Sequence, residues 1–253
     1  MKVFITGASS GIGDALARHY AGHGAVLGLA ARRAAQLQAL ADTLATPVCI
    51  YALDVTDGAA LAAAAEDFIA HHGVPDIVIA NAGISAGTWS ERAADIAVLA
   101  KIMQVNVLGM AATLQPFAAP MRARGSGVLV GIASVAGFRG FAGAGAYCAS
   151  KSAAVTWLES LRLELHGSGV DVVTICPGFV ATPLTAANRN PMPFLLEAPE
   201  AARRIARAIG ARKRLAIIPW QMRLVFFVMR RMPNALYDRL FARAPRKSRD
   251  SPG

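Results

Sequence analysis

Tyr147 and Lys151 stand four positions apart and carry complementary acid–base chemistry. Residues at this spacing share one face of a helix, so the phenol and the ammonium would be neighbours. A free tyrosine has a pKa of about 10 and is a poor base at neutral pH. A neighbouring ammonium stabilises the phenolate, so we expect Lys151 to lower the pKa of Tyr147. Such a pair can give a proton to, or take one from, an oxygen atom of a bound molecule.

A second segment that could bind a ligand is glycine-rich. It reads Gly7-Ala8-Ser9-Ser10-Gly11-Ile12-Gly13. It lies between a short apolar run, 2–6, and a helical pattern, 14–22. Glycines let the backbone approach a pyrophosphate, and the N-terminus of a helix offers free N–H groups and a positive dipole end. The spacing differs from the common G-x-G-x-x-G fingerprint, and a simple tight turn is the alternative interpretation.

Short apolar runs alternate with helical patterns along most of the chain. The expected strands are 2–6, 25–31, 48–53, 76–80, 127–132, 170–175 and 215–218. The expected helices are 14–22, 33–44, 57–72, 98–122, 147–166 and 200–210, the fourth with a break near Asn106 or Pro116. Uniformly apolar strands are typical of parallel sheets buried on both faces. The pattern predicts an α/β fold: one doubly wound Rossmann domain over 1–218, with a seven-stranded parallel sheet flanked by helices.

Composition excludes several classes of protein. Of the 253 residues, 55% are hydrophobic and 17% are charged, which excludes a disordered chain. Cys49, Cys148 and Cys176 are widely spaced and odd in number, which argues against a disulfide scaffold or a zinc ribbon. No histidine has metal-ligand spacing with carboxylates or cysteines. The start of the chain shows no signal-peptide pattern, and we expect a cytoplasmic protein.

Taken together and in order, these motifs resemble the classical short-chain dehydrogenase/reductase family over about residues 2–218. The matching blocks are Thr6–Gly13, Asp54-Val55, Asn81-Ala82-Gly83, Asn106, Ser134, Tyr147-x3-Lys151 and Pro177-Gly178-x3-Thr182. The resemblance implies an oxidoreductase that transfers hydride between nicotinamide C4 and a carbonyl or secondary alcohol. It also implies a homo-oligomer, either a dimer or a tetramer.

The resemblance assigns catalytic roles to four residues. Ser134 would orient and polarise the substrate carbonyl, and Tyr147 would give or take the proton. Lys151 would tune Tyr147 and hold the nicotinamide ribose. Asn106 would bend a helix and hold a water that relays protons to the lysine. No metal is needed, because Ser134 and Tyr147 replace a Lewis acid.

The resemblance also assigns a set of residues to the nicotinamide cofactor. They are Gly7, Ser9, Ser10, Gly11, Ile12, Gly13, Arg32, Arg33, Asp54, Val55, Asn81, Ala82, Gly83, Tyr147, Lys151, Pro177, Gly178, Val180 and Thr182. Ala31 occupies the position where an acidic residue would favour NAD, and Arg32 can meet a 2′-phosphate with its planar fork. We therefore predict NADP(H). NAD(H) is the alternative if Arg32 and Arg33 only begin a solvated helix face.

The basic excess lies at the end of the chain. Residues 203–250 hold 14 lysines and arginines against Asp238 and Asp250, within a net charge of +10. We assign 219–253 to a basic, amphipathic, helical C-terminal extension. Its apolar run between Arg223 and Arg230 is too short to span a bilayer, but 220–249 could lie on a membrane surface. Packing on its own or a partner subunit is the main alternative, and the absence of a known module argues against nucleic acid.

The substrate is predicted from two apolar segments. Residues 183–199 occupy the position of the family's mobile lid and include the apolar stretch 191–196, although a helix packed on the body would explain it equally. With the extension, this favours a hydrophobic, lipid-like carbonyl or alcohol and a cytoplasmic protein peripheral to the membrane. A 3-oxoacyl-thioester reductase shares all the core motifs, and a non-catalytic cofactor-binding regulator or scaffold is an alternative of another class.

Overall fold

The computed structural model describes residues 1–186, 188 and 190–242. Seven strands form one sheet: β1 (Lys2–Thr6), β2 (Val26–Ala31), β3 (Val48–Ala52), β4 (Ile77–Ala80), β5 (Gly127–Ile132), β6 (Val170–Pro177) and β9 (Leu215–Ile218). Their order is β3-β2-β1-β4-β5-β6-β9, and every neighbouring pair is parallel. The prediction of a seven-stranded, doubly wound parallel sheet is confirmed.

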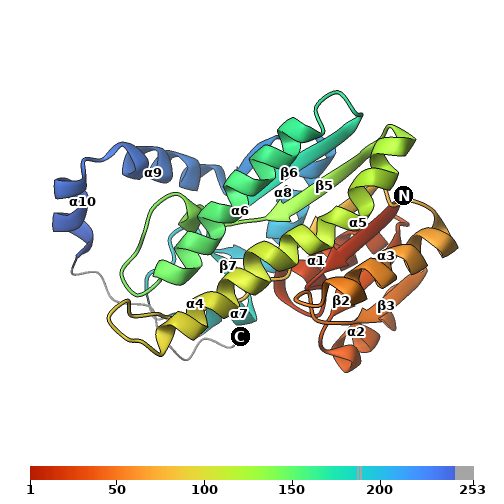
Figure 1. Cartoon of the computed structure of the whole chain (residues 1–253), viewed down its shortest axis with the longest axis horizontal. Coiled ribbons are helices and arrows are strands. Elements are labelled where there is room, and N and C mark those ends of the chain that lie inside the picture. The colour runs from red at the N-terminus through yellow and green to blue at the C-terminus, as the bar shows by residue number, and fades with distance from the viewer. Residues whose placement is uncertain (187, 189, 243–253) are drawn as a thin grey trace.

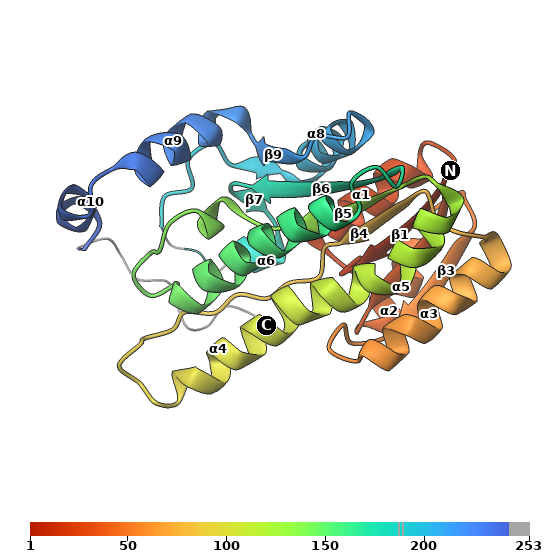
Figure 2. The same cartoon turned by 45° about the horizontal axis from the view of Figure 1, so that its top comes forward.

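Helices cover both faces of the sheet, as Figures 1 and 2 show. One face packs against α1 (Gly11–Ala21), α2 (Ala34–Ala41) and α8 (Ala198–Gly210). The other packs against α3 (Gly58–His72), α5 (Gly109–Arg124) and α6 (Gly145–Glu164). Because apolar side chains on both faces of the strands meet apolar helix stripes, the sheet lies between two hydrophobic cores.

A long helical run crosses the second face. It comprises α4 (Asp95–Met103), a π-helical turn (Gln104–Leu108) and α5. The expected break near Asn106 is therefore present as a π-helical turn, whereas the helix continues through Pro116. Among the described residues, Asp95–Arg124 is the one helix with the length and apolar composition of a membrane span. Leu114, Phe117 and Met121 of this helix are fully buried in the second core.

The segment between β6 and α8 contains short elements. These are β7 (Val180–Ala181), α7 (Pro183–Ala186) and β8 (Leu196–Glu197), with β7 pairing with β8. The C-terminal extension forms two helices, α9 (Trp220–Arg231) and α10 (Asn234–Phe241). The basic stretch 245–249 lies outside the described residues.

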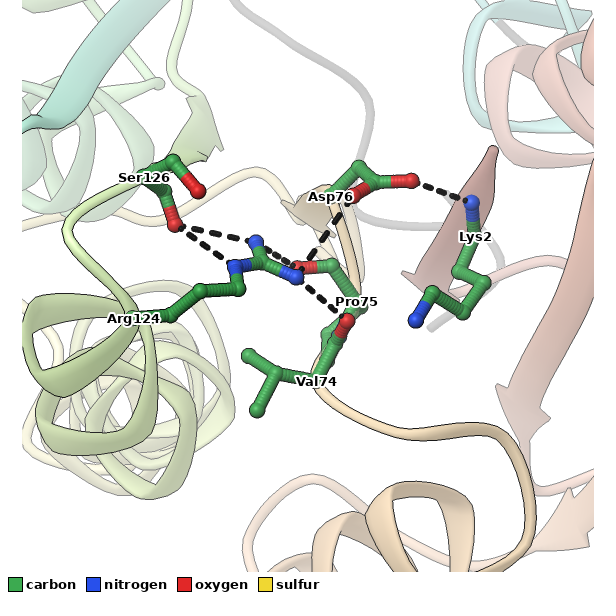
Figure 3. Close-up of polar contacts among 6 residues, drawn as sticks. All are labelled: Lys2, Val74, Pro75, Asp76, Arg124 and Ser126. Atoms are coloured by element: carbon green, nitrogen blue, oxygen red, sulfur yellow. Dashed lines mark hydrogen bonds and ion pairs between the residues drawn. The ribbon is translucent and has the colours of Figure 1, made fainter.

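Polar contacts tie the amino ends of the central strands together, at the sheet edge drawn in Figure 3. The backbone N–H of Lys2 donates to Asp76 Oδ2 at 2.8 Å. Arg124, at the end of α5, donates to the carbonyls of Val74 and Pro75 at 2.6 and 2.7 Å, and also bonds the Ser126 carbonyl. This network joins α5 to β1, β4 and β5 at the amino ends of these strands. Ligand sites in open parallel sheets lie at the opposite, carboxyl ends.

Candidate active site

The carboxyl ends of the strands meet at a cleft of about 310 Å³. Strand order reverses between β1 and β4, which is where open parallel sheets form a ligand crevice. All of the residues predicted for catalysis or cofactor binding line this cleft except Gly13 and Asn106, which are buried. Segments far apart in the sequence are thus brought together at one edge of the sheet.

Several lining residues were not individually predicted from the sequence, although the last three of them fall in the segment 183–199 that was predicted as a lid. They are Leu53, Ile84, Val105, Ile132, Ala133, Pro183, Leu184 and Thr185. Most are apolar residues beside a predicted one and carried no separate signal. Thr185 is different, because its hydroxyl donates to the Val180 carbonyl at 2.6 Å and accepts from the Thr182 N–H at 3.1 Å. The Thr-x-x-Thr spacing at 182–185 was the signal available.

The glycine loop is closely packed against the end of β4. Gly7 has φ +67°, and a Cβ there would lie 2.7 Å from the Ala82 Cα. A Cβ on Gly13 would overlap the Gly7 carbonyl oxygen. Asn81 Nδ2 donates to the carbonyls of Thr6 and Gly7, both at 3.1 Å. Backbone therefore lines the floor of the cleft, beside the N-terminus of α1, whose preceding Ser10 makes no side-chain cap.

Gly13→Ala is expected to weaken both folding and cofactor binding, because its Cβ has no space beside the Gly7 carbonyl. We expect a loss of unfolding free energy of about 2 kcal/mol, comparable to other overpacking substitutions. Gly58→Ala is the matched control, since nothing lies within 4 Å of the added Cβ on that helix. Urea denaturation of both variants measures the effect. Equal stability of the two would contradict the packing of the loop.

Ser134, Tyr147 and Lys151 lie together beside the end of β5. Ser134 follows β5, is buried, and its Oγ accepts from the Ala136 N–H at 3.1 Å. The Tyr147 side chain is hydrogen-bonded to that of Ser134. Lys151 Nζ lies 5.8 Å from the centre of the Tyr147 ring and donates to the Ile132 carbonyl at 2.9 Å. The two hydroxyls and the ammonium thus converge at one end of the cleft.

The electrostatics of this cluster differ from the sequence prediction. Burial raises the pKa of Tyr147 to about 12, against a smaller lowering by the hydrogen bond to Ser134. Burial also lowers the pKa of Lys151 to about 8. The expected lowering of the tyrosine pKa by Lys151 is therefore wrong, because desolvation dominates and the smaller lowering comes from Ser134. At neutral pH the site holds a neutral phenol and a charged lysine.

Asn106 is fully buried and supports the cluster from behind. Its Oδ1 accepts from the Ile84 N–H at 2.8 Å, and its Nδ2 donates to the Ile84 carbonyl and to Ser150 Oγ, both at 3.0 Å. Ser150 in turn donates to the Tyr147 carbonyl at 2.8 Å. A Cβ on Gly83 would lie 3.3 Å from Asn106 Oδ1 and 3.5 Å from Lys151 Nζ, so both groups border the space at Gly83.

Two arginines at the end of β2 take different positions. Arg33 donates to Ser9 Oγ at 2.9 Å and to Ser10 Oγ at 2.7 Å, so it lies over the glycine loop. Arg32, the arginine favoured from the sequence, lies with its guanidinium 3.8 Å from Asp54 Oδ2. Both line the cleft. Arg33 and two serine hydroxyls therefore form a cluster of hydrogen-bond donors beside Arg32.

The apolar stretch at 191–196 forms neither a lid over the cleft nor a helix. Phe194 and Leu195 are exposed, and Leu196 packs against the first core through β8. None of these three residues lines the cleft, whose wall on this side is made by Pro183, Leu184 and Thr185. The prediction that this stretch contacts the substrate therefore receives no support from its position.

Comparison with known proteins is consistent with this geometry. A family model described as short chain dehydrogenase matches residues 1–193. An uncharacterised oxidoreductase of Myxococcus xanthus is 41% identical, over 92% of this chain and 93% of its own. An 11-beta-hydroxysteroid dehydrogenase-like protein 4A of Arabidopsis thaliana is 32% identical, over 94% of this chain and 82% of its own. A short-chain dehydrogenase structure from Streptomyces avermitilis has a TM-score of 0.80 at 26% identity, covering 95% of this chain and 94% of its own.

The chain belongs to the short-chain dehydrogenase/reductase family. It is an oxidoreductase whose Rossmann fold binds a nicotinamide cofactor and whose substrate is a small molecule. These findings do not favour the alternative of a non-catalytic scaffold.

Proposed function

We propose that the protein is an NADP(H)-dependent oxidoreductase that interconverts a hydrophobic carbonyl compound and its secondary alcohol. The observation that carries the NADP(H) preference is the cluster of Arg33 with Ser9 and Ser10 at the end of β2. Its donors suit a phosphate monoester, and Ala31 leaves no carboxylate there to receive ribose hydroxyls. The hydrophobic substrate is supported by the name of the steroid dehydrogenase-like relative.

The residues of the cleft fit a dinucleotide. The glycine loop exposes backbone at the N-terminus of α1, where a pyrophosphate is favourable. Asp54 and Val55 would hold the adenine, and Lys151, Val180 and Thr182 would hold the nicotinamide half. When bound, the cofactor supplies or accepts the hydride.

The chain's own residues supply the proton and its control. In the reductive direction, the Tyr147 hydroxyl donates its proton to the carbonyl oxygen as the carbon accepts hydride, and Ser134 donates a hydrogen bond to the same oxygen. The resulting phenolate is stabilised by the nearby Lys151 ammonium. Because the pKa of Tyr147 lies at about 12, the phenol is protonated and ready to act as an acid at neutral pH. The reverse steps apply to alcohol oxidation.

Arg33→Ala is expected to raise the Kd for NADPH about tenfold or more while leaving that for NADH nearly unchanged, because a charge-assisted contact to phosphate is lost. Arg32→Ala should have a smaller effect, since Asp54 already lies near its guanidinium. Arg122→Ala removes one exposed charge at the end of α5 and serves as the control. Fluorescence titration with both cofactors measures the effect. An unchanged NADPH preference in Arg33→Ala would refute the phosphate assignment.

A further inference from the structure

The C-terminal extension has two apolar faces, and only one of them is used for packing. Met222, Phe226 and Met229 of α9 are buried, together with Tyr237 of α10. They form a third cluster with Ala133, Val135 and Cys176, which flank the ends of β5 and β6. The inward face therefore packs on the same subunit, beside the residues that carry Ser134. This packing supports the interpretation that the extension packs on its own subunit. It does not explain the apolar residues on the outer face.

The outer face consists of Trp220, Leu224, Val225, Phe227, Val228, Leu236 and Leu240, all exposed. These seven are nearly half of the fifteen large apolar side chains exposed in the described part of the chain. A surface helix of a soluble domain ordinarily turns polar residues outward. Figures 1 and 2 both show α10 at the outer end of the molecule, away from the sheet. We call these seven exposed residues the outer apolar face.

Basic side chains border this face. Arg223, Arg230, Arg231 and Arg239 are exposed, and Asp238 is the one acidic residue in the described part of the extension. The Arg231 guanidinium lies 3.6 Å from the centre of the Phe227 ring, so this charge lies over an exposed aromatic side chain of the face. Exposed aromatic and aliphatic side chains bordered by arginines suit the boundary between lipid acyl chains and anionic headgroups.

The charge selects the occupant of the face. If a second copy paired with the same face about a two-fold axis, it would bring the two sets of arginines together. Anionic lipid headgroups would instead neutralise them. We propose that the outer apolar face of α9 and α10 docks the protein on an anionic membrane surface.

The opposite side of the extension contacts the segment between Ser134 and α6. Between Ser134 and α6, Arg139 donates to Asn234 Oδ1 at 3.0 Å and lies 4.1 Å from the centre of the Tyr237 ring. The Tyr237 hydroxyl donates to the Gly140 carbonyl at 2.7 Å. These contacts tie α10 to the segment that leads to Tyr147. The proposal stands on this surface alone and does not depend on the cofactor or substrate assigned above.

The test is co-sedimentation of the full chain with vesicles of phosphatidylcholine, with and without phosphatidylglycerol. We expect binding to the anionic vesicles, weakened by salt, and a loss of about tenfold or more in Leu224→Asp/Phe227→Asp. Leu163→Asp is the matched control, because Leu163 is 61% exposed on α6 and Leu224 is 62% exposed. Thermal unfolding verifies that each variant folds.

Two further measurements keep the proposal falsifiable. Arg223→Gln/Arg230→Gln should weaken binding to anionic vesicles while leaving the melting temperature unchanged. Wild-type levels of binding in Leu224→Asp/Phe227→Asp would overturn the proposal, because a contact elsewhere, such as the basic C-terminus, would then suffice. The proposal would also be overturned if the wild type did not bind vesicles and light scattering showed that it is an oligomer that dissociates in Leu224→Asp/Phe227→Asp. That result would identify a second copy of the chain as the occupant.

Discussion

Tyr147→Phe is expected to lower kcat by about 10²- to 10⁴-fold, the range that a positioned general acid contributes. The substitution removes the proton donor and keeps the ring, so the Kd for NADPH should change less than about twofold, because a ring without its hydroxyl preserves the packing. Tyr51→Phe is the matched control. Tyr51 lies on the edge strand β3, its hydroxyl donates a hydrogen bond to Asp67, and it does not line the cleft. Steady-state turnover and cofactor titration measure the two quantities. Full turnover in Tyr147→Phe would contradict the assigned acid.

The second large effect concerns Lys151, whose charge is held in a buried position. The pKa of Lys151 falls from 10.5 to about 8 on burial. Such a shift corresponds to a penalty on the order of 3 kcal/mol while both folded and unfolded lysines are protonated. The penalty is partly balanced by the hydrogen bond from Nζ to the Ile132 carbonyl. Lys151→Met should therefore raise the unfolding free energy at pH 7 by about 2 kcal/mol, while lowering turnover by about 100-fold or more.

The pH dependence of this stability difference follows from the lowered pKa. Between about pH 8 and 10.5 the unfolded lysine holds its proton and the folded lysine has lost it, so wild-type stability rises with pH. The advantage of Lys151→Met should be full below pH 8 and shrink toward pH 10.5. Urea denaturation at several pH values tests this, with Lys101→Met, an exposed lysine, as the control. A variant less stable than wild type at pH 7 would contradict the desolvation penalty.

The sequence predicted the architecture well because the parallel strands are apolar throughout and alternate with helices. It also located the break near Asn106, which is a π-helical turn with the Asn106 amide bonded to Ile84. It did not distinguish that position from Pro116. Proline removes one helix hydrogen bond and its ring crowds the preceding turn, and the buried packing of Leu114 and Phe117 outweighs that cost here.

Most residues that line the cleft were predicted from the sequence, whereas their pKa values and side-chain directions were not. Which of Arg32 and Arg33 reaches the glycine loop depends on side-chain directions at the start of α2, and adjacent residues give no sequence signal for that. The pKa of Tyr147 depends on how many atoms surround it, and burial is a property of the fold rather than of spacing. Likewise, α9 is apolar on two sides, so its sequence could not show which side packs inward.

The most direct test of the central claim is a single-turnover reaction with NADPH deuterated at both positions of nicotinamide C4 and a panel of carbonyl compounds graded by chain length. The panel should include a 3-oxoacyl thioester, which tests the alternative reductase. The account predicts that deuterium appears on the carbinol carbon of the alcohol formed from apolar carbonyls, and that NADPH reacts faster than NADH. Alcohol formed without deuterium at that carbon, or an enzyme that turns over NADH in preference, would contradict it.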